Sequence, residues 1–132
     1  MRVFCDTSSL VALLDEDEAR HEEAGRILRR LADEQARLVS HNYIVVETMA
    51  LVDRRLGRPS LVRLLDGLLP LIEVVWVDPP LHDAALKVHL AMSRSSSFVD
   101  QVSFRLMRDL ALESALAFDD DFEAEGFRTL RA

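Results

Sequence analysis

The fold class can be inferred from residues 2–14, which read RVFCDTSSLVALL. The first four of these residues form a short β-branched and aromatic run, which is typical of a strand. Residues 6–9 are of the kinds that favour turns and helix N-termini, and an apolar helical pattern follows them up to Leu14. This stretch therefore predicts a strand, a tight turn and a helix.

The alternation of short strands and helices continues along the chain. Residues 18–35 carry apolar side chains at Ala24, Ile27, Leu28 and Leu31, which predicts an amphipathic surface helix. The other predicted elements are a brief strand at 38–39, a helix over 42–56 ended by Gly57, a helix over 59–69 stopped by Pro70, a strand over 73–77, a helix from Pro79 or Pro80 to about Arg94, a helix over 98–112 capped by Ser96 or Ser97, a strand over 114–118 and a closing strand over 127–130. Strands joined by helical crossovers predict an α/β fold, with a mostly parallel central sheet of four or five short strands flanked by helices.

Length and composition restrict the class of protein. The 132 residues leave room for one domain, which we expect to span residues 1–132. Hydrophobic residues make up 49% and charged residues 30%, the balance of a chain that buries a core. The 23 acidic side chains outnumber the 16 basic ones, so attraction to a polyanion cannot alone explain the function. A histone-like or polybasic binder is excluded.

The sequence also carries signals of cellular location. Cys5 is the one cysteine, so no intramolecular disulfide framework exists and a reducing compartment is the default. The N-terminal apolar stretch is interrupted by polar residues and runs into four acids, unlike a signal peptide. No uncharged apolar segment approaches the about 20 residues that span a membrane. We therefore expect a soluble, cytoplasmic protein without a membrane partner.

Two acids directly follow predicted strands. In parallel α/β sheets ligands bind beyond the carboxyl ends of the strands, which is where Asp6 and Asp119 are expected. Each residue has a structural alternative. Asp6 is also placed to cap the following helix, and Asp119 begins an acidic run with Asp120 and Asp121 that is typical of a solvated turn.

Glu47 is the third candidate, and it lies within a predicted helix. Its neighbours three and four residues away are Tyr43, Ile44, Ala50 and Leu51, so its carboxylate is expected on an apolar face. Burial of a carboxylate without a partner costs several kcal/mol, so Glu47 requires a cation, a donor or a cleft. A structural salt bridge is the alternative.

Asp100 is the fourth candidate. It shares a helical face with Phe104 and Met107, which places it at the mouth of an apolar stripe. It also stands three residues after Ser97, as the acid of a capping box does. Capping alone is therefore its structural alternative.

Together the acids Asp6, Glu47, Asp100 and Asp119 predict a metal site. Carboxylates that converge near one edge of a sheet repel each other and raise each other's pKa unless a cation lies between them. An all-oxygen ligand set favours Mg²⁺ or Mn²⁺. Such an ion suits phosphodiester hydrolysis, because it polarises the phosphoryl oxygen and generates hydroxide at neutral pH.

Arginines near Gly57 suggest where a substrate binds. Arg54, Arg55 and Arg58 cluster around this predicted helix end, where guanidinium groups could hold phosphates. The alternative is a solvated helix C-terminus, at which cations are favoured.

Four segments resemble the PIN domains of VapC-type toxins. These segments are Val3–Leu10, Val45–Thr48, Phe98–Phe104 and Ala117–Phe122, and their order and spacing extend the resemblance over nearly the whole chain. The resemblance implies a metal-dependent ribonuclease that is the toxin half of a type II toxin–antitoxin pair. It also implies a homodimer and a VapB-type antitoxin that places a tail in the acidic cleft.

The resemblance also assigns roles to residues. It implies that Asp6 and Asp100 bind Mg²⁺, or Mn²⁺ in its place, and that Glu47 and Asp119 complete the catalytic site directly or through water. The hydroxyl that the family often places beside its first acid is supplied here by Thr7 or Ser8. Two positions depart from the family pattern: Asp121 is a second candidate for the fourth acid, and Cys5 replaces an aliphatic residue and is expected to be a buried, inert side chain.

The histidines and a leucine-rich segment are the remaining features of the sequence. The four histidines, His21, His41, His82 and His89, are expected at the surface or at helix ends. The leucine-rich segment 61–72 suits core packing or a contact with a dimer partner or antitoxin.

A toprim-like or phosphotransfer enzyme would also use a strand-end Asp, although Ser8 stands where a haloacid-dehalogenase-type phosphatase needs an acid. A catalytically silent PIN-like binding module is the alternative outside the enzymes, and metal titration distinguishes it.

Overall fold

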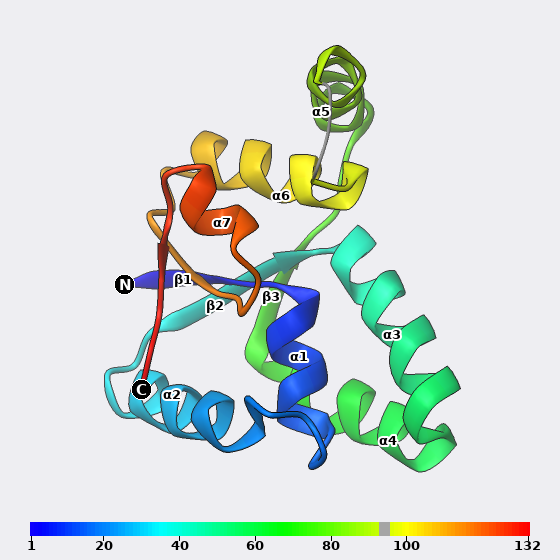
Figure 1. The fold of residues 1–132 in the computed structure, drawn as a ribbon, viewed down its shortest axis with the longest axis vertical. Helices are drawn as coiled ribbons and strands as arrows, with labels where there is room; N and C mark the ends of the chain where they lie inside the picture. Colours follow the sequence, from blue (N-terminus) through cyan, green and yellow to red (C-terminus); the bar gives the residue numbers. More distant parts are fainter. Residues whose placement is uncertain (93–95) are drawn as a thin grey trace.

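A computed structural model describes residues 1–92 and 96–132 and shows a parallel sheet flanked by helices (Figure 1). The sheet has five strands in the order β3-β2-β1-β4-β5, and every neighbouring pair is parallel. The strands are β1 (Arg2–Cys5), β2 (Arg37–His41), β3 (Ile72–Val75), β4 (Ser114–Leu116) and β5 (Arg128–Thr129). The helices are α1 (Thr7–Leu14), α2 (His21–Asp33), α3 (Asn42–Leu56), α4 (Arg58–Arg63), α5 (Pro79–Ala91), α6 (Phe98–Asp109) and α7 (Asp121–Ala124). The predicted α/β fold class is confirmed.

The helices form a layer on each side of the sheet. Figure 1 shows α1 and α2 on one side and α6 and α7 on the other, with α5 standing beyond α6. The central strand β1 is covered on both faces, and its residues Val3, Phe4 and Cys5 are buried. This burial explains why β1 reads as a continuous apolar run instead of an alternating one. The ring of Phe122 in α7 packs against Phe4, with 5.9 Å between ring centroids.

Three strands, β3, β4 and β5, are shorter than predicted, and beyond β3 and β4 the backbone bonds to a side chain of another element. The N–H of Val77 donates to Oδ1 of Asn42 at 2.6 Å, and β3 ends at Val75. The N–H of Phe118 donates to Oγ of Ser8 at 3.0 Å, and β4 ends at Leu116. Beyond β3 and β4, side-chain acceptors from helices therefore take the place of backbone hydrogen bonds between strands.

The prediction of one helix over 59–69 is wrong. Helix α4 ends at Arg63, a π-helical turn covers Leu64–Leu68, and a 3₁₀ turn covers Leu69–Leu71. Pro70 lies in the last turn, where its ring and its missing N–H prevent a regular α-helix from continuing. The leucine-rich segment divides between two environments: Leu64 and Leu68 are buried, whereas Leu65 and Leu71 are exposed.

Several helix boundaries also differ from the prediction. Helix α2 begins at His21, and α6 ends at Asp109. Ala111, two residues later, has a left-handed backbone with φ of 55°, which the predicted helix to 112 would not allow. Helix α5 ends at Ala91, and Arg94 lies outside the described residues. In contrast, α3 has its predicted bounds, because Gly57 after it adopts φ of 89° and its N–H bonds to the carbonyls of residues 52 and 53.

The side chains of Cys5 and His41 are both buried. Cys5 is 1% exposed, and burial raises the pKa of its thiol to about 12, as expected for an inert side chain. His41 lies at a helix end, as predicted, but it is fully buried and not at the surface. Its Nε2 contacts Oγ of Ser103 at 2.8 Å, and burial lowers its pKa to about 4. No helix in the described part of the chain has the length and apolar character needed to cross a membrane.

Candidate active site

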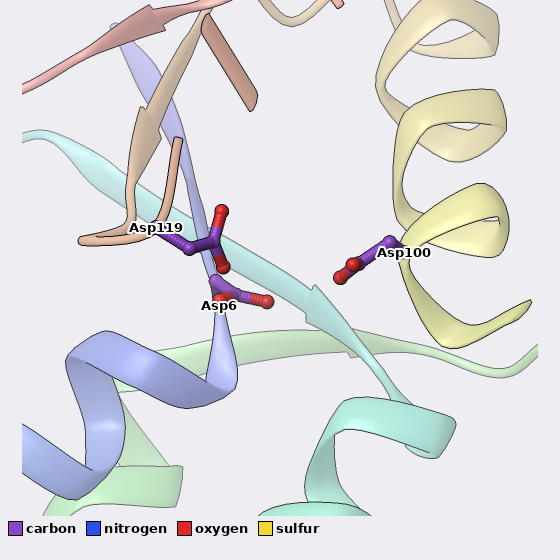
Figure 2. A group of neighbouring side chains, drawn as sticks. All are labelled: Asp6, Asp100 and Asp119. Atoms are coloured by element: carbon purple, nitrogen blue, oxygen red, sulfur yellow. The ribbon is translucent and has the colours of Figure 1, made fainter. Parts of the chain in front are cut away.

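Three of the predicted acids converge beyond the carboxyl ends of the strands. Asp6 follows β1, Asp119 follows β4, and Asp100 lies in the first turn of α6. One carboxylate oxygen from each residue lies within 4.8 Å of the others. Because β1 and β4 are adjacent and parallel, Asp6 and Asp119 emerge from the same edge of the sheet, and Figure 2 shows Asp100 facing them from α6.

Burial raises the pKa of all three carboxylates, and neighbouring negative charges add to this effect. Asp6 is 4% exposed, and burial together with the negative charges of Asp119 and Asp100 raises its pKa to about 8. Burial is also the main reason that the pKa of Asp100 rises to about 6 and that the pKa of Asp119 rises. Within the described residues, no basic side chain forms an ion pair with any of the three. A hard divalent cation fits this set of oxygen donors and would compensate their charge.

Ser8 fixes the position of Asp6. Oδ2 of Asp6 accepts hydrogen bonds from the Ser8 hydroxyl at 2.8 Å and from the Ser8 N–H at 3.3 Å. The same hydroxyl accepts from the N–H of Phe118, the residue before Asp119. Asp6 is thus both the N-cap of α1 and a member of the acidic cluster, so its two predicted roles are compatible. Ser8 ties the first acid to the segment that carries Asp119.

Asp100 is likewise both the acid of a capping box and a member of the acidic cluster. Its Oδ2 accepts from the N–H of Ser97 at 3.3 Å, and its own N–H donates to Oγ of Ser97 at 3.1 Å. This capping box fixes the start of α6. A carboxylate has several acceptor positions, so the cap leaves capacity for a metal ion.

Glu47 finds a hydroxyl partner instead of a salt bridge. Its Oε1 accepts from Oγ1 of Thr7 at 2.6 Å, and Thr7 in turn accepts from Oγ1 of Thr48 at 3.3 Å. The side chain is half-buried and lines the same cleft, but it is not one of the three clustered acids. The two predicted hydroxyls therefore serve different acids: Thr7 holds Glu47 and Ser8 holds Asp6.

The acids of the run 119–121 occupy different places in the structure. Asp119 belongs to the cluster, and its Oδ1 accepts from the N–H of Asp121 at 3.1 Å. Asp121 starts α7 and is outside the three-residue group. The geometry favours Asp119 over Asp121 as the fourth predicted acid.

A cleft of about 410 Å³ contains these acids and extends away from them. Of the three arginines predicted to bind substrate, Arg55 lines the cleft, whereas Arg54 and Arg58 do not. Arg58 instead pairs with Asp53, at 3.0 Å from Nε to Oδ1. Arg20 also lines the cleft, although the sequence analysis did not select it. The predicted helix over 18–35 includes Arg20, but α2 begins at His21, so the helical pattern does not give the direction of this side chain.

Comparison with protein families matches residues 3–127 to the family described as PIN domain. The chain belongs to the PIN-domain family. A curated relative, the 23S rRNA-specific endonuclease VapC20 of Mycobacterium tuberculosis, is 34% identical over 131 residues, which are 98% of each chain. The resemblance of four sequence segments to VapC-type toxins predicted this family, and the prediction is confirmed. The predicted class of function, a ribonuclease toxin, is confirmed as well.

Three solved structures are similar to this chain. The crystal structure of VapC20 from M. tuberculosis, described as a sarcin–ricin loop cleaving toxin, matches with a TM-score of 0.86 at 32% identity and covers 98% of this chain and 99% of that one. The structure of VapBC2 from Rickettsia felis matches over 98% of both chains with a TM-score of 0.74 at 10% identity. FitAcB from Neisseria gonorrhoeae matches over 98% of this chain and 96% of that one with a TM-score of 0.71 at 17% identity. The last two share the fold.

Proposed function

We propose that this PIN-domain protein is an Mg²⁺-dependent endoribonuclease, with Mn²⁺ able to substitute, in which Asp6, Asp100 and Asp119 bind the ion. The observation that carries this proposal is the convergence of three carboxylate oxygens within 4.8 Å around a buried Asp6. Mutual repulsion makes this arrangement unfavourable for three ionised acids alone, and a hard cation removes the repulsion.

When bound, the ion would polarise the phosphoryl oxygen and lower the pKa of a bound water. The protein contributes positioning. Ser8 and the α1 N-terminus hold the Asp6 carboxylate, and the capping box holds Asp100. The hydroxyl of Thr7 donates a hydrogen bond to Oε1 of Glu47. Oε2 of Glu47 can then accept a hydrogen bond from a water or a ribose hydroxyl in the cleft. Glu47 is thus placed to orient a reacting group without being buried in the cluster.

The substrate we propose is a stem-loop of the large-subunit ribosomal RNA. The support is the M. tuberculosis relative, a 23S rRNA-specific endonuclease that matches this chain along its whole length at 34% identity. Cleavage of intact ribosomes, free ribosomal RNA and a tRNA pool, followed by mapping of the product ends, tests this assignment. Cleavage of tRNA with intact ribosomal RNA would contradict it.

The activity itself is tested by incubating purified protein and RNA with EDTA, Mg²⁺ or Mn²⁺. Asp6→Asn and Asp100→Asn remove charge from the cluster, and Asp120→Asn is a matched control because this exposed acid neighbours Asp119 but lies outside the cluster. The proposal expects metal-dependent cleavage that the first two variants lose and the control keeps. If neither ion raises the melting temperature and no RNA is cut, the protein is a silent binding module.

For the partners, we propose a homodimer and a VapB-type antitoxin whose arginine-bearing tail enters the acidic cleft. The excess of acids lining the cleft supports a basic tail. A second, mostly apolar pocket of about 480 Å³ lies between α1, α2 and the π-helical turn, lined in part by Leu14, Leu28 and Val62, and suits an apolar antitoxin segment. Light scattering of the free protein and of a co-expressed complex measures both stoichiometries.

A further inference from the structure

The cleft has an acidic end and a basic end, and α3 spans the distance between them. Glu47, Leu51 and Arg55 are spaced by four residues, so they lie on one face of α3, and all three line the cleft. The eight residues from Glu47 to Arg55 correspond to a rise of about 12 Å along the helix axis. The cleft therefore extends well beyond the acidic cluster, far enough for nucleotides that flank the scissile bond.

The opposite wall shows the same polarity. Thr7 and Ser8 line the cleft at the start of α1, Val11 and Ala12 follow along the helix, and Glu18 and Arg20 line it beyond the end of the helix. Among the described residues lining the cleft, the acids are Asp6, Glu18, Glu47, Asp100 and Asp119, and the bases are Arg20 and Arg55. Arg55 thus lies about two helical turns from Glu47, and Arg20 lies against the ring of Phe118, the residue before Asp119.

Arg20 is held in place by two neighbours. Its Nη1 donates to Oε1 of Glu23 at 2.7 Å, and its Cζ lies 5.5 Å from the centre of the Phe118 ring. Phe118 directly precedes Asp119 and bonds to Ser8. The guanidinium is therefore positioned by the same segment that positions the acidic cluster, while about half of its side chain stays accessible to a ligand (49% exposed).

Arg55 is held more loosely. Its Nη1 lies 3.8 Å from Oε1 of Glu18, and its side chain is 51% exposed. An exposed ion pair at this distance contributes little stability, so a phosphate can replace the carboxylate at small cost. Glu18 lies at the same end of the cleft as both arginines and keeps the local charge near balance in the free protein.

We infer that Arg20 and Arg55 are substrate-binding residues that hold RNA backbone phosphates flanking the scissile one. This inference rests on the proposed ribonuclease function and adds how the RNA strand is oriented in the cleft. A metal ion at the acidic cluster can coordinate the scissile phosphate but does not reach the phosphates that flank it. Flanking phosphates need other cations, and guanidinium groups bind phosphate oxygens in a bidentate manner. Such contacts position RNA without reading its sequence.

The test compares Arg20→Gln, Arg55→Gln and the double variant with Arg54→Gln. Arg54 is the matched control, because it is an exposed arginine on the same helix that does not line the cleft. Initial rates on a ribosomal stem-loop RNA give kcat and KM at several salt concentrations. We expect KM to rise about 10-fold for each single variant with kcat within about 2-fold of wild type. The slope of log KM against log salt should fall by about 0.7 for each arginine removed, and the control should match wild type.

A second measurement separates this inference from the activity. Binding of the same fluorescent RNA to each variant in EDTA, measured by anisotropy, needs no cleavage and still reports the phosphate contacts. If wild type binds RNA with the expected salt dependence but never cuts it, the ribonuclease proposal fails and the arginine assignment stands. Unchanged KM, binding and salt slope in the double variant would overturn the assignment. A fall in kcat together with a lower affinity for Mg²⁺ would overturn it too, because it would show a structural effect on the acids.

Discussion

The two ends of the cleft hold their charges in different ways. At the acidic end Asp6 is almost fully buried, the hydroxyl and N–H of Ser8 fix its carboxylate, and the N–H of Ser97 holds that of Asp100. At the basic end Arg20 and Arg55 are half exposed, and they pair with the half-buried Glu23 and with Glu18 respectively. Carboxylates that lie close together in a covered site are stable only if the fold holds them there and a cation offsets their repulsion. Exposed arginines attract a phosphate only over a short distance, because salt screens their charge.

This difference separates chemistry from binding. Changes at the acidic end should alter kcat, metal affinity and the pH dependence of stability. Changes at the basic end should alter KM and its salt dependence. The four predictions below test this separation, beginning with the largest expected effect.

Loss of a clustered acid should abolish cleavage. We expect Asp100→Asn to lower kcat at least about 1,000-fold, because a metal ligand and a charge needed in the transition state are removed together. We also expect Mg²⁺ to raise the melting temperature of wild type but not that of the variant. Asp120→Asn should keep both properties, and residual metal-dependent activity of Asp100→Asn within 10-fold of wild type would contradict the assigned role.

Loss of the Thr7 hydroxyl should have an intermediate effect. Thr7 donates to Oε1 of Glu47 and is not one of the clustered acids, so Thr7→Val should lower kcat about 10-fold while Mg²⁺ affinity changes less than about 3-fold. Thr7→Ser retains a hydroxyl and should restore most of the rate. Equal losses in both variants would show that packing at position 7, and not the hydrogen bond, matters.

The pH dependence of stability should reveal the buried acid. In EDTA, folded Asp6 has a pKa of about 8 against an ordinary value of 3.8, so the folded state keeps a proton that the unfolded chain releases. Wild-type stability relative to Asp6→Asn should therefore be highest near pH 4 and fall as pH rises toward 8. Asparagine keeps the N-cap, so at pH 8 the variant should melt about 5 °C or more above wild type.

The difference between wild type and Asp6→Asn is the quantity to measure, because His41 titrates in both proteins. Burial lowers the pKa of His41 to about 4, so its contribution is complete above about 6.5 and is lost as pH falls toward 4. This opposite trend cancels in the difference. A constant difference between pH 4 and pH 8 would contradict the raised pKa of Asp6.

Removal of the carboxylate that pairs with Arg55 should have the smallest effect. Glu18→Gln takes a competing carboxylate from the basic end, so KM for RNA should fall about 2-fold to 3-fold with kcat unchanged. Glu16→Gln is the control, since Glu16 is exposed in the same acidic run and does not line the cleft. A higher KM for Glu18→Gln would show that Glu18 orients Arg55 for binding.

The amino-acid sequence alone determined the layout of the fold and the acidic end of the site. The apolar run before Asp6 predicted β1, and Gly57 predicted the end of α3, because strand burial and helix termination are coded by residues next to one another. The same local rule located Asp6 and Asp119 at strand ends. The sequence also predicted both roles of Asp100, since one spacing of Ser97 and Asp100 serves the cap and the cluster.

Only the tertiary structure decided the basic end and the assignment of the hydroxyls. The contact of Arg20 with Phe118 joins residues far apart in the chain and leaves no periodic trace in either segment. Thr7 and Ser8 are equivalent as sequence neighbours, and the packing of α1 between α3 and the end of β4 directs one to Glu47 and the other to Asp6. Side-chain acceptors from α3 and α1, Asn42 and Ser8, likewise lie beyond the early ends of β3 and β4. Local patterns fix backbone hydrogen bonding, whereas the partner of an individual side chain depends on which elements meet in space.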